Sequence, residues 1–210
     1  SMYVYEREQK WPWGHRNVVF AERGGPIVYI NRALYRGSQW QDMYPVKAGL
    51  DDISPYELWD ILGRSGKKVA VISHTGATGM GTDWSKYEEP IDYALENVVE
   101  IYQGARASYE GLNAPQPALG IGRMPLSPEA PLPTEAGRQE FGANNAGVYQ
   151  TALAQGHRLG VFASSDHLSE HVSYGGVYVK DWTREGIIEA LSERRTVAAT
   201  DKIYLEFSCN

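Results

Sequence analysis

The sequence has little cysteine, no excess of positive charge and no long apolar run, and each shortage excludes a class of protein. Cys209 is the only cysteine, so no disulfide forms within the chain and the compartment stays open. Lys and Arg number 20 against 26 Asp and Glu, and this net charge of −6 argues against nucleic-acid and membrane partners. No stretch approaches the roughly 20 apolar residues that span a bilayer, and the first residues lack the features of a signal peptide.

The remaining composition is that of a globular protein. The 210 residues are 42% hydrophobic and 11% aromatic, which is enough apolar material for a core. Residues 114–133 hold six of the eleven prolines, and we interpret them as a surface loop inserted into one domain, residues 1–203. Residues 204–210 have the pattern of a further strand that begins at the end of the chain.

Strand-like and helix-like segments alternate along this domain. Strands are predicted over residues 16–22, 26–30, 67–73, 98–102, 159–164 and 176–180. Helices are predicted from a capping box of Ser54 and Glu57, over residues 145–155, and after a Thr183 cap. This order predicts an α/β fold with largely parallel strands.

Acidic and histidine residues mark the ends of the apolar strands. His74 directly follows one strand, Asp166 and His167 follow another, and Glu100 lies inside a third. The carboxyl ends of parallel strands meet at one edge of a sheet, so these side chains are expected to converge. Imidazole and carboxylate groups together are typical ligands of Zn²⁺, Mn²⁺ or Fe.

Structural interpretations of the same residues stay open. A histidine at a strand end is more often a hydrogen-bonding loop residue than a ligand. Glu100 could face solvent or pair with Arg106. His157 follows a predicted helix, where the helix dipole favours a positive charge, and we interpret it as structural.

A second motif uses some of these residues. His167, Glu170 and His171 match the H-x-x-E-H pattern of inverted zinc peptidases. That chemistry requires a helix, and the glycine-containing segment after His171 leaves little room for one. A zinc peptidase is therefore the third hypothesis for function.

Four segments together resemble the PHP (polymerase and histidinol phosphatase) superfamily, in particular large bacterial PHP-like proteins of unknown function. They are Ile72-Ser73-His74-Thr75, Val99-Glu100-Ile101-Tyr102, Ser165-Asp166-His167 and residues 198–203. The resemblance implies a distorted (β/α)7 barrel, partial or complete, with one to three divalent ions at the carboxyl ends of its strands. It implies metal ligation by Glu6, His15, His74, Asp166 and His167.

The resemblance also implies roles in chemistry. Asp166 and His167 would be catalytic, and which of this adjacent pair binds metal is open, because many PHP proteins have one residue between them. Apart from the resemblance, Arg106 and Lys202 are candidates for binding the anionic group of a substrate. If the chain is an enzyme, it is expected to be a metal-dependent phosphoesterase acting on a small molecule or another phosphoester.

One feature of the family is absent. PHP domains begin with a His-x-His strand, whereas the five histidines here are never separated by a single residue. The chain resembles the later part of such a domain, and its ligands are expected to hold one metal well. A partial barrel leaves sheet edges unpaired, which favours a homo-oligomer.

A non-catalytic binding or assembly module on the same scaffold is the alternative. The sequence holds six Trp and 14 Tyr, whose flat rings suit sugars or protein partners. Five of the tryptophans lie in polar contexts and are expected to be exposed: Trp11, Trp13, Trp40, Trp84 and Trp182.

Overall fold

A computed structural model describes residues 1–7, 9, 12–28, 54–77, 81–88, 90–104, 107–111, 113–114, 145–166 and 173–203. Within them, six strands form one sheet: β1 (Tyr3–Arg7), β2 (His15–Phe20), β3 (Val69–His74), β4 (Glu96–Gln103), β5 (Ala107–Ser108) and β6 (Gly160–Ser164). Two more strands, β7 (Tyr174–Val177) and β8 (Thr196–Ala199), pair with each other. The helices are α2 (Pro55–Arg64), α4 (Tyr149–Ala154) and α5 (Arg184–Ser192), with short 3-10 turns η2 (Trp84–Lys86) and η3 (Asn145–Gly147).

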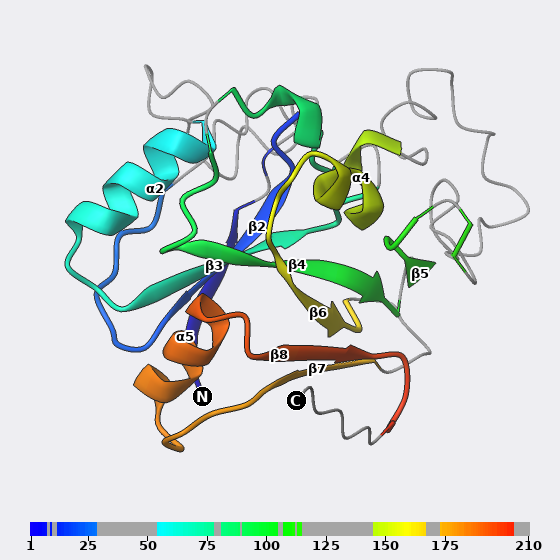
Figure 1. Cartoon of the computed structure of the whole chain (residues 1–210). Coiled ribbons are helices and arrows are strands. Elements are labelled where there is room, and N and C mark those ends of the chain that lie inside the picture. The colour runs from blue at the N-terminus through cyan, green and yellow to red at the C-terminus, as the bar shows by residue number, and fades with distance from the viewer. Residues whose placement is uncertain are drawn as a thin grey trace, which may run out of the picture.

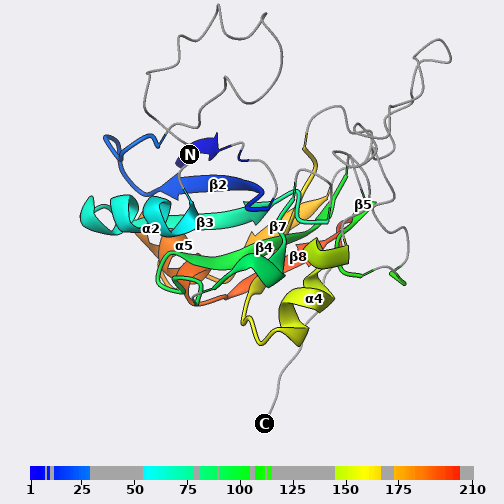
Figure 2. The ribbon, with the colours of Figure 1, turned by 90° about the horizontal axis from the view of Figure 1, so that it is seen from above.

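The sheet is mixed, so the predicted α/β class is confirmed in its coarse form. Strand β4 runs parallel to β3 and β6, whereas β1–β2, β2–β3 and β4–β5 are antiparallel. The strands lie side by side when seen from above (Figure 2). The described strands form an open sheet and do not close into a barrel.

Helix α2 begins where its sequence predicts. The Ser54 hydroxyl accepts the Glu57 backbone N–H, and the Glu57 carboxylate accepts the Ser54 N–H at 2.9 Å, which completes the capping box. Pro55 occupies the first helical turn, where it has no backbone donor to lose. Gly66, at φ +65°, turns the chain away after the helix. Such a cap contributes about 1 kcal/mol.

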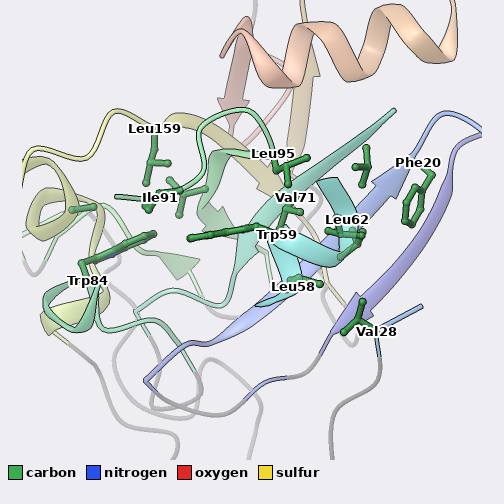
Figure 3. Close-up of a cluster of buried hydrophobic side chains, with 14 residues drawn as sticks. Phe20, Val28, Leu58, Trp59, Leu62, Val71, Trp84, Ile91, Leu95 and Leu159 are labelled. Atoms are coloured by element: carbon green, nitrogen blue, oxygen red, sulfur yellow. The ribbon is translucent and has the colours of Figure 1, made fainter. Parts of the chain in front are cut away.

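Helices α2 and α5 lie on opposite sides of the sheet (Figure 1), and each packs on a separate apolar cluster. Leu58, Trp59 and Leu62 of α2 pack on one face, against alternate residues of β2 and β3 that include Val71 (Figure 3). Ile188 and Leu191 of α5 pack on the other face, against the intervening residues. Because strand side chains alternate between faces, neighbouring residues of β2 and β3 belong to different environments.

Several predicted boundaries differ from the structure. Residues 26–28 of the predicted strand 26–30 form no strand, and residues 29–30 lie outside the described part. The predicted helix 145–155 is a 3-10 turn followed by the short helix α4, whose N-cap Val148 has no side chain able to cap it. Thr183 does cap α5, by accepting the Gly186 backbone N–H at 3.0 Å.

Two predicted segments are not described. Residues 115–144 cover nearly all of the proline-rich insertion, and residues 204–210 are the predicted terminal strand. Among the residues that the structure does describe, no helix is both long and apolar enough to cross a membrane.

Candidate functional site

Acidic and histidine side chains from the sheet gather on the face that α5 covers elsewhere. His15 of β2 lies directly opposite His74 at the end of β3, and Glu6 comes from the neighbouring strand β1. Glu100 comes from β4, and Asp166 follows the end of β6. The alternation of the strands turns these side chains to one face, which brings together residues from five places in the sequence.

The contacts form a continuous series. The Glu6 Oε1 atom lies 3.1 Å from His15 Nδ1 and 3.4 Å from His74 Nε2. The same His74 nitrogen lies 3.6 Å from Asp166 Oδ2. Glu6 retains 38% of its side-chain exposure while both histidines retain 8%. The site is therefore buried on the sheet and open to solvent at its β1 edge.

Glu100 holds the other side of the His74 ring. His74 Nδ1 lies 2.9 Å from Glu100 Oε2, which also accepts the Thr75 backbone N–H at 3.1 Å. The Ser164 hydroxyl donates to the second oxygen of Glu100. Glu100 is 2% exposed, so the alternative in which it faces solvent is wrong. The contact with Glu100 orients the His74 ring so that Nε2 faces Glu6 and Asp166.

The surrounding carboxyl groups change the protonation of His74. Burial disfavours its charged form, but the opposing charge of Glu100 and then those of Glu6 and Asp166 outweigh burial and raise the pKa of His74 to about 9. Burial raises the pKa of Glu6, yet the hydrogen bond with His15 and the charge of His74 prevail and lower it overall. Three carboxyl groups thus surround one imidazole ring, which is positively charged at neutral pH.

Unusual backbone angles occur where two of the strands end. Thr75 and Asp166, which follow β3 and β6, adopt φ angles of 56° and 57°. This left-handed region is tolerated by Asp but is rare for β-branched Thr. The turn at Thr75 points its N–H at Glu100, and the turn at Asp166 follows the strand that pairs with β4. Strained backbone of this kind is typical of functional sites.

The structure brings together four of the five ligands that the resemblance implies: Glu6, His15, His74 and Asp166. The fifth, His167, lies outside the described residues, as do Arg106, Glu170 and His171. Lys202 is exposed in the segment after β8. The pairing of Glu100 with Arg106, the zinc-peptidase motif and the anion-binding roles therefore stay predictions.

Sequence reasoning missed Gln103, the last residue of β4. It is fully buried, and its Nε2 atom lies 2.5 Å from Asp166 Oδ2 and 3.3 Å from Glu100 Oε2. A polar side chain three residues after Glu100 in an apolar strand was the available signal.

The donor set suits a divalent cation, although the side chains are not closed around one. Among the described residues, no group of three or more His, Cys, Asp and Glu side chains is arranged so that it could hold a metal ion. Imidazole nitrogens and carboxylate oxygens are nevertheless the ligands of Zn²⁺, Mn²⁺ and Fe²⁺. Two atoms bound at about 2.1 Å to a tetrahedral ion lie about 3.4 Å apart, close to the 3.4 and 3.6 Å at His74 Nε2.

A second polar cluster lies on the α2 face of the same sheet. Glu96 of β4 accepts Arg16 Nε at 2.8 Å, Trp59 Nε1 at 2.9 Å and the Ser73 hydroxyl at 2.6 Å. Arg16 also donates to the Tyr87 hydroxyl and to two backbone carbonyls of residues 13 and 14. Arg16 and Glu96 are both fully buried, and each is matched by partners of opposite character. This cluster is structural.

The exposure expected for one tryptophan is corrected by the structure. Trp84 is 1% exposed and contacts the His157 ring, whose centroid lies 5.5 Å away. Burial there lowers the pKa of His157, and its ring is packed as a structural residue. Trp182 is 85% exposed, as expected, and Trp13 is partly buried. Trp11 and Trp40 lie outside the described residues.

Comparison with known proteins gives no relative: no family model, no curated protein and no solved structure matches the chain. The resemblance to the PHP superfamily therefore rests on the motifs quoted above and stays a prediction. What bears on function is the arrangement of the side chains around His74.

Proposed function

We propose that the chain is a metal-dependent hydrolase that acts on phosphoesters, on a fold of the PHP barrel type. Glu6, His15, His74 and Asp166 hold a divalent ion in this proposal, with His167 as a further ligand. The observation that carries it is the environment of His74, with one ring nitrogen beside Glu100 and the other beside Glu6 and Asp166. Histidines that ligate metals almost always have such a carboxylate or carbonyl partner behind them.

The charge of the site supports the same proposal. The carboxyl groups of Glu6, Glu100 and Asp166 surround His74. Buried carboxylates require a cation, a proton or hydrogen-bond donors. A divalent ion held by Glu6, His74 and Asp166 would replace the proton on His74 Nε2 and would supply more positive charge. It would therefore satisfy the carboxyl groups better than the imidazolium does.

Each protein side chain is assigned a role in this proposal. Bound Zn²⁺, Mn²⁺ or Fe²⁺ supplies a polarised phosphoryl oxygen and a water of lowered pKa. Glu100 orients His74 from behind, and Glu6 stands at the solvent-exposed edge where a substrate approaches. Asp166 and His167 are assigned to catalysis, and Arg106 and Lys202 to the anionic group of the substrate.

Metal titration tests the first half of the proposal. Chelator-treated protein is titrated calorimetrically with Mn²⁺, and we expect saturable binding that is lost in His74→Gln and Glu6→Gln. The control is His157→Gln, because His157 is the described histidine that is not a proposed ligand, and its ring packs against Trp84. An unchanged isotherm in His74→Gln, or no binding by the wild type, contradicts the proposal.

Hydrolysis tests the second half. With Mn²⁺ present, p-nitrophenyl phosphate and its diester are expected to be cleaved, and the chelator is expected to abolish turnover. The non-catalytic alternative is favoured by one observation: Trp182 and Tyr178 are 85% and 61% exposed at the β7–α5 connection. Metal binding without turnover of any ester supports that binding module and contradicts the hydrolase.

A further inference from the structure

We propose that Gln103 is a positioning residue of this site and that Tyr109 fixes the direction of its amide. The inference rests on the proposed metal site and names what sets its geometry. Gln103 Nε2 donates to Asp166 Oδ2 at 2.5 Å and to Glu100 Oε2 at 3.3 Å. One amide group therefore joins the carboxyl group behind His74 to the one in front of it.

The direction of the amide is decided by Tyr109. A glutamine amide has a donor end and an acceptor end, and only the donor end suits two carboxyl groups. The Tyr109 hydroxyl donates to Gln103 Oε1 at 2.9 Å, which engages the acceptor end. The reverse orientation would place Oε1 against two carboxylate oxygens and leave NH₂ facing a hydroxyl.

Tyr109 is itself held in place by its backbone. It follows the short strand β5 and is 1% exposed. Its N–H donates to Ile101 of β4 at 2.8 Å, and its carbonyl accepts the Tyr149 N–H at 2.8 Å. The turn between β4 and β5 thus returns the Tyr109 ring to the end of the strand that carries Gln103.

Gln103 also lies where β4 and β6 separate. It is opposite Ser164, the last residue of β6, and the next residue, Gly104, donates its N–H to the Ser164 carbonyl at 2.9 Å. Asp166 turns away two residues later with its left-handed backbone. The Gln103 amide holds the Asp166 carboxyl group toward His74 at this point, so it sets the separation of the proposed ligands.

Mn²⁺ affinity in a double-mutant cycle tests the proposal on the full chain. Gln103→Met is expected to weaken Mn²⁺ binding by about 10- to 100-fold, the loss typical when a partner of a metal ligand is removed. Tyr109→Phe is expected to weaken it less. Because Tyr109 acts through Gln103, Tyr109→Phe is expected to cause no further loss in the Gln103→Met background. Tyr149→Phe, which removes a hydroxyl bonded to the Leu159 carbonyl, is the matched control and keeps full affinity.

Two results overturn the inference. One is wild-type Mn²⁺ affinity in Gln103→Met. The other is an equal loss of affinity from Tyr109→Phe in the wild-type and Gln103→Met backgrounds, because the effects of a general structural role are additive.

A measurement without metal separates the role of Gln103 from the proposed function. The Gln103 side-chain NH₂ signal is expected to be protected from hydrogen exchange in the wild type and to lose at least about tenfold protection in Asp166→Ala and Tyr109→Phe. Absent Mn²⁺ binding by the wild type overturns the metal site, and this signal then decides whether Gln103 holds Asp166.

Discussion

The two buried polar clusters use neighbouring residues of the same strands but are built differently. Arg16 and Ser73 point to the α2 face, and the adjacent His15 and His74 point to the opposite face. On the α2 face, Glu96 meets a guanidinium whose charge is permanent. On the other face, Glu6, Glu100 and Asp166 meet imidazole, whose charge depends on a proton.

This difference separates a structural cluster from the proposed metal site. Burial disfavours the charge of Arg16, but Glu96 outweighs it and the pKa of Arg16 is raised, so the guanidinium keeps its charge at every accessible pH. The positive charge of the site around His74 comes from a proton, which exchanges with solvent. The α2-face cluster needs no further cation, because Arg16 supplies a permanent one. In the site around His74, a metal ion can replace the proton.

The largest effect is expected on the α2 face. Arg16→Met leaves the buried Glu96 carboxylate without its cation and is expected to lower the free energy of unfolding by about 3–5 kcal/mol. Urea denaturation measures it. Arg64→Met is the control, because Arg64 is 74% exposed and pairs with Asp60 on the surface, where about 0.3–0.5 kcal/mol is expected. A loss below about 1 kcal/mol in Arg16→Met contradicts the structural role.

A pH dependence is expected on the face that carries His74. The folded metal-free protein holds the His74 proton more tightly than the unfolded chain, since its pKa is raised from 6.5 to about 9. The stability that this proton gives is complete below about pH 6.5 and is lost as pH rises through about 9, with a size on the order of 3 kcal/mol. The difference in unfolding free energy between wild type and His74→Gln, measured from pH 6 to 9.5, checks it. A constant difference across this range contradicts it.

Mn²⁺ is expected to act on one cluster alone. At 100 times its Kd it adds about 2.7 kcal/mol to the free energy of unfolding. Trp59→Phe removes a donor to Glu96 on the α2 face and is expected to keep that increment, whereas His74→Gln loses it. Equal increments in both variants mean that the ion binds elsewhere.

The sequence predicts which residues form the site better than it predicts which residues they contact. Capping residues such as Ser54 and Thr183 act within four residues, so their helices begin where predicted. His74 and Asp166 were found because polar residues stand out after apolar strands. His74 and Asp166 lie close together because β3, β4 and β6 pair in parallel, as is common in α/β sheets.

Long-range pairs with no local signal could not be predicted. Arg16 and Glu96 are 80 positions apart, and nothing in either segment indicates the other. The contact of Tyr109 with Gln103 depends on the turn between β4 and β5, which involves only a two-residue strand. The antiparallel directions of β1 and β2 are likewise decided by tertiary pairing and not by the apolar pattern.

The smallest effect is expected from Asp166→Asn, and the same chemical change on the α2 face provides the comparison. Asp166→Asn in the metal-free protein is expected to change the free energy of unfolding by less than about 1 kcal/mol, because lost attraction to His74 is offset by lost repulsion with Glu6. Asn tolerates the left-handed backbone at this position, and its carbonyl still accepts from Gln103. Glu96→Gln, the same change beside Arg16, is expected to cost about 3–5 kcal/mol. Chemical denaturation of both variants measures the contrast, and similar losses would mean that Asp166 is as structural as Glu96.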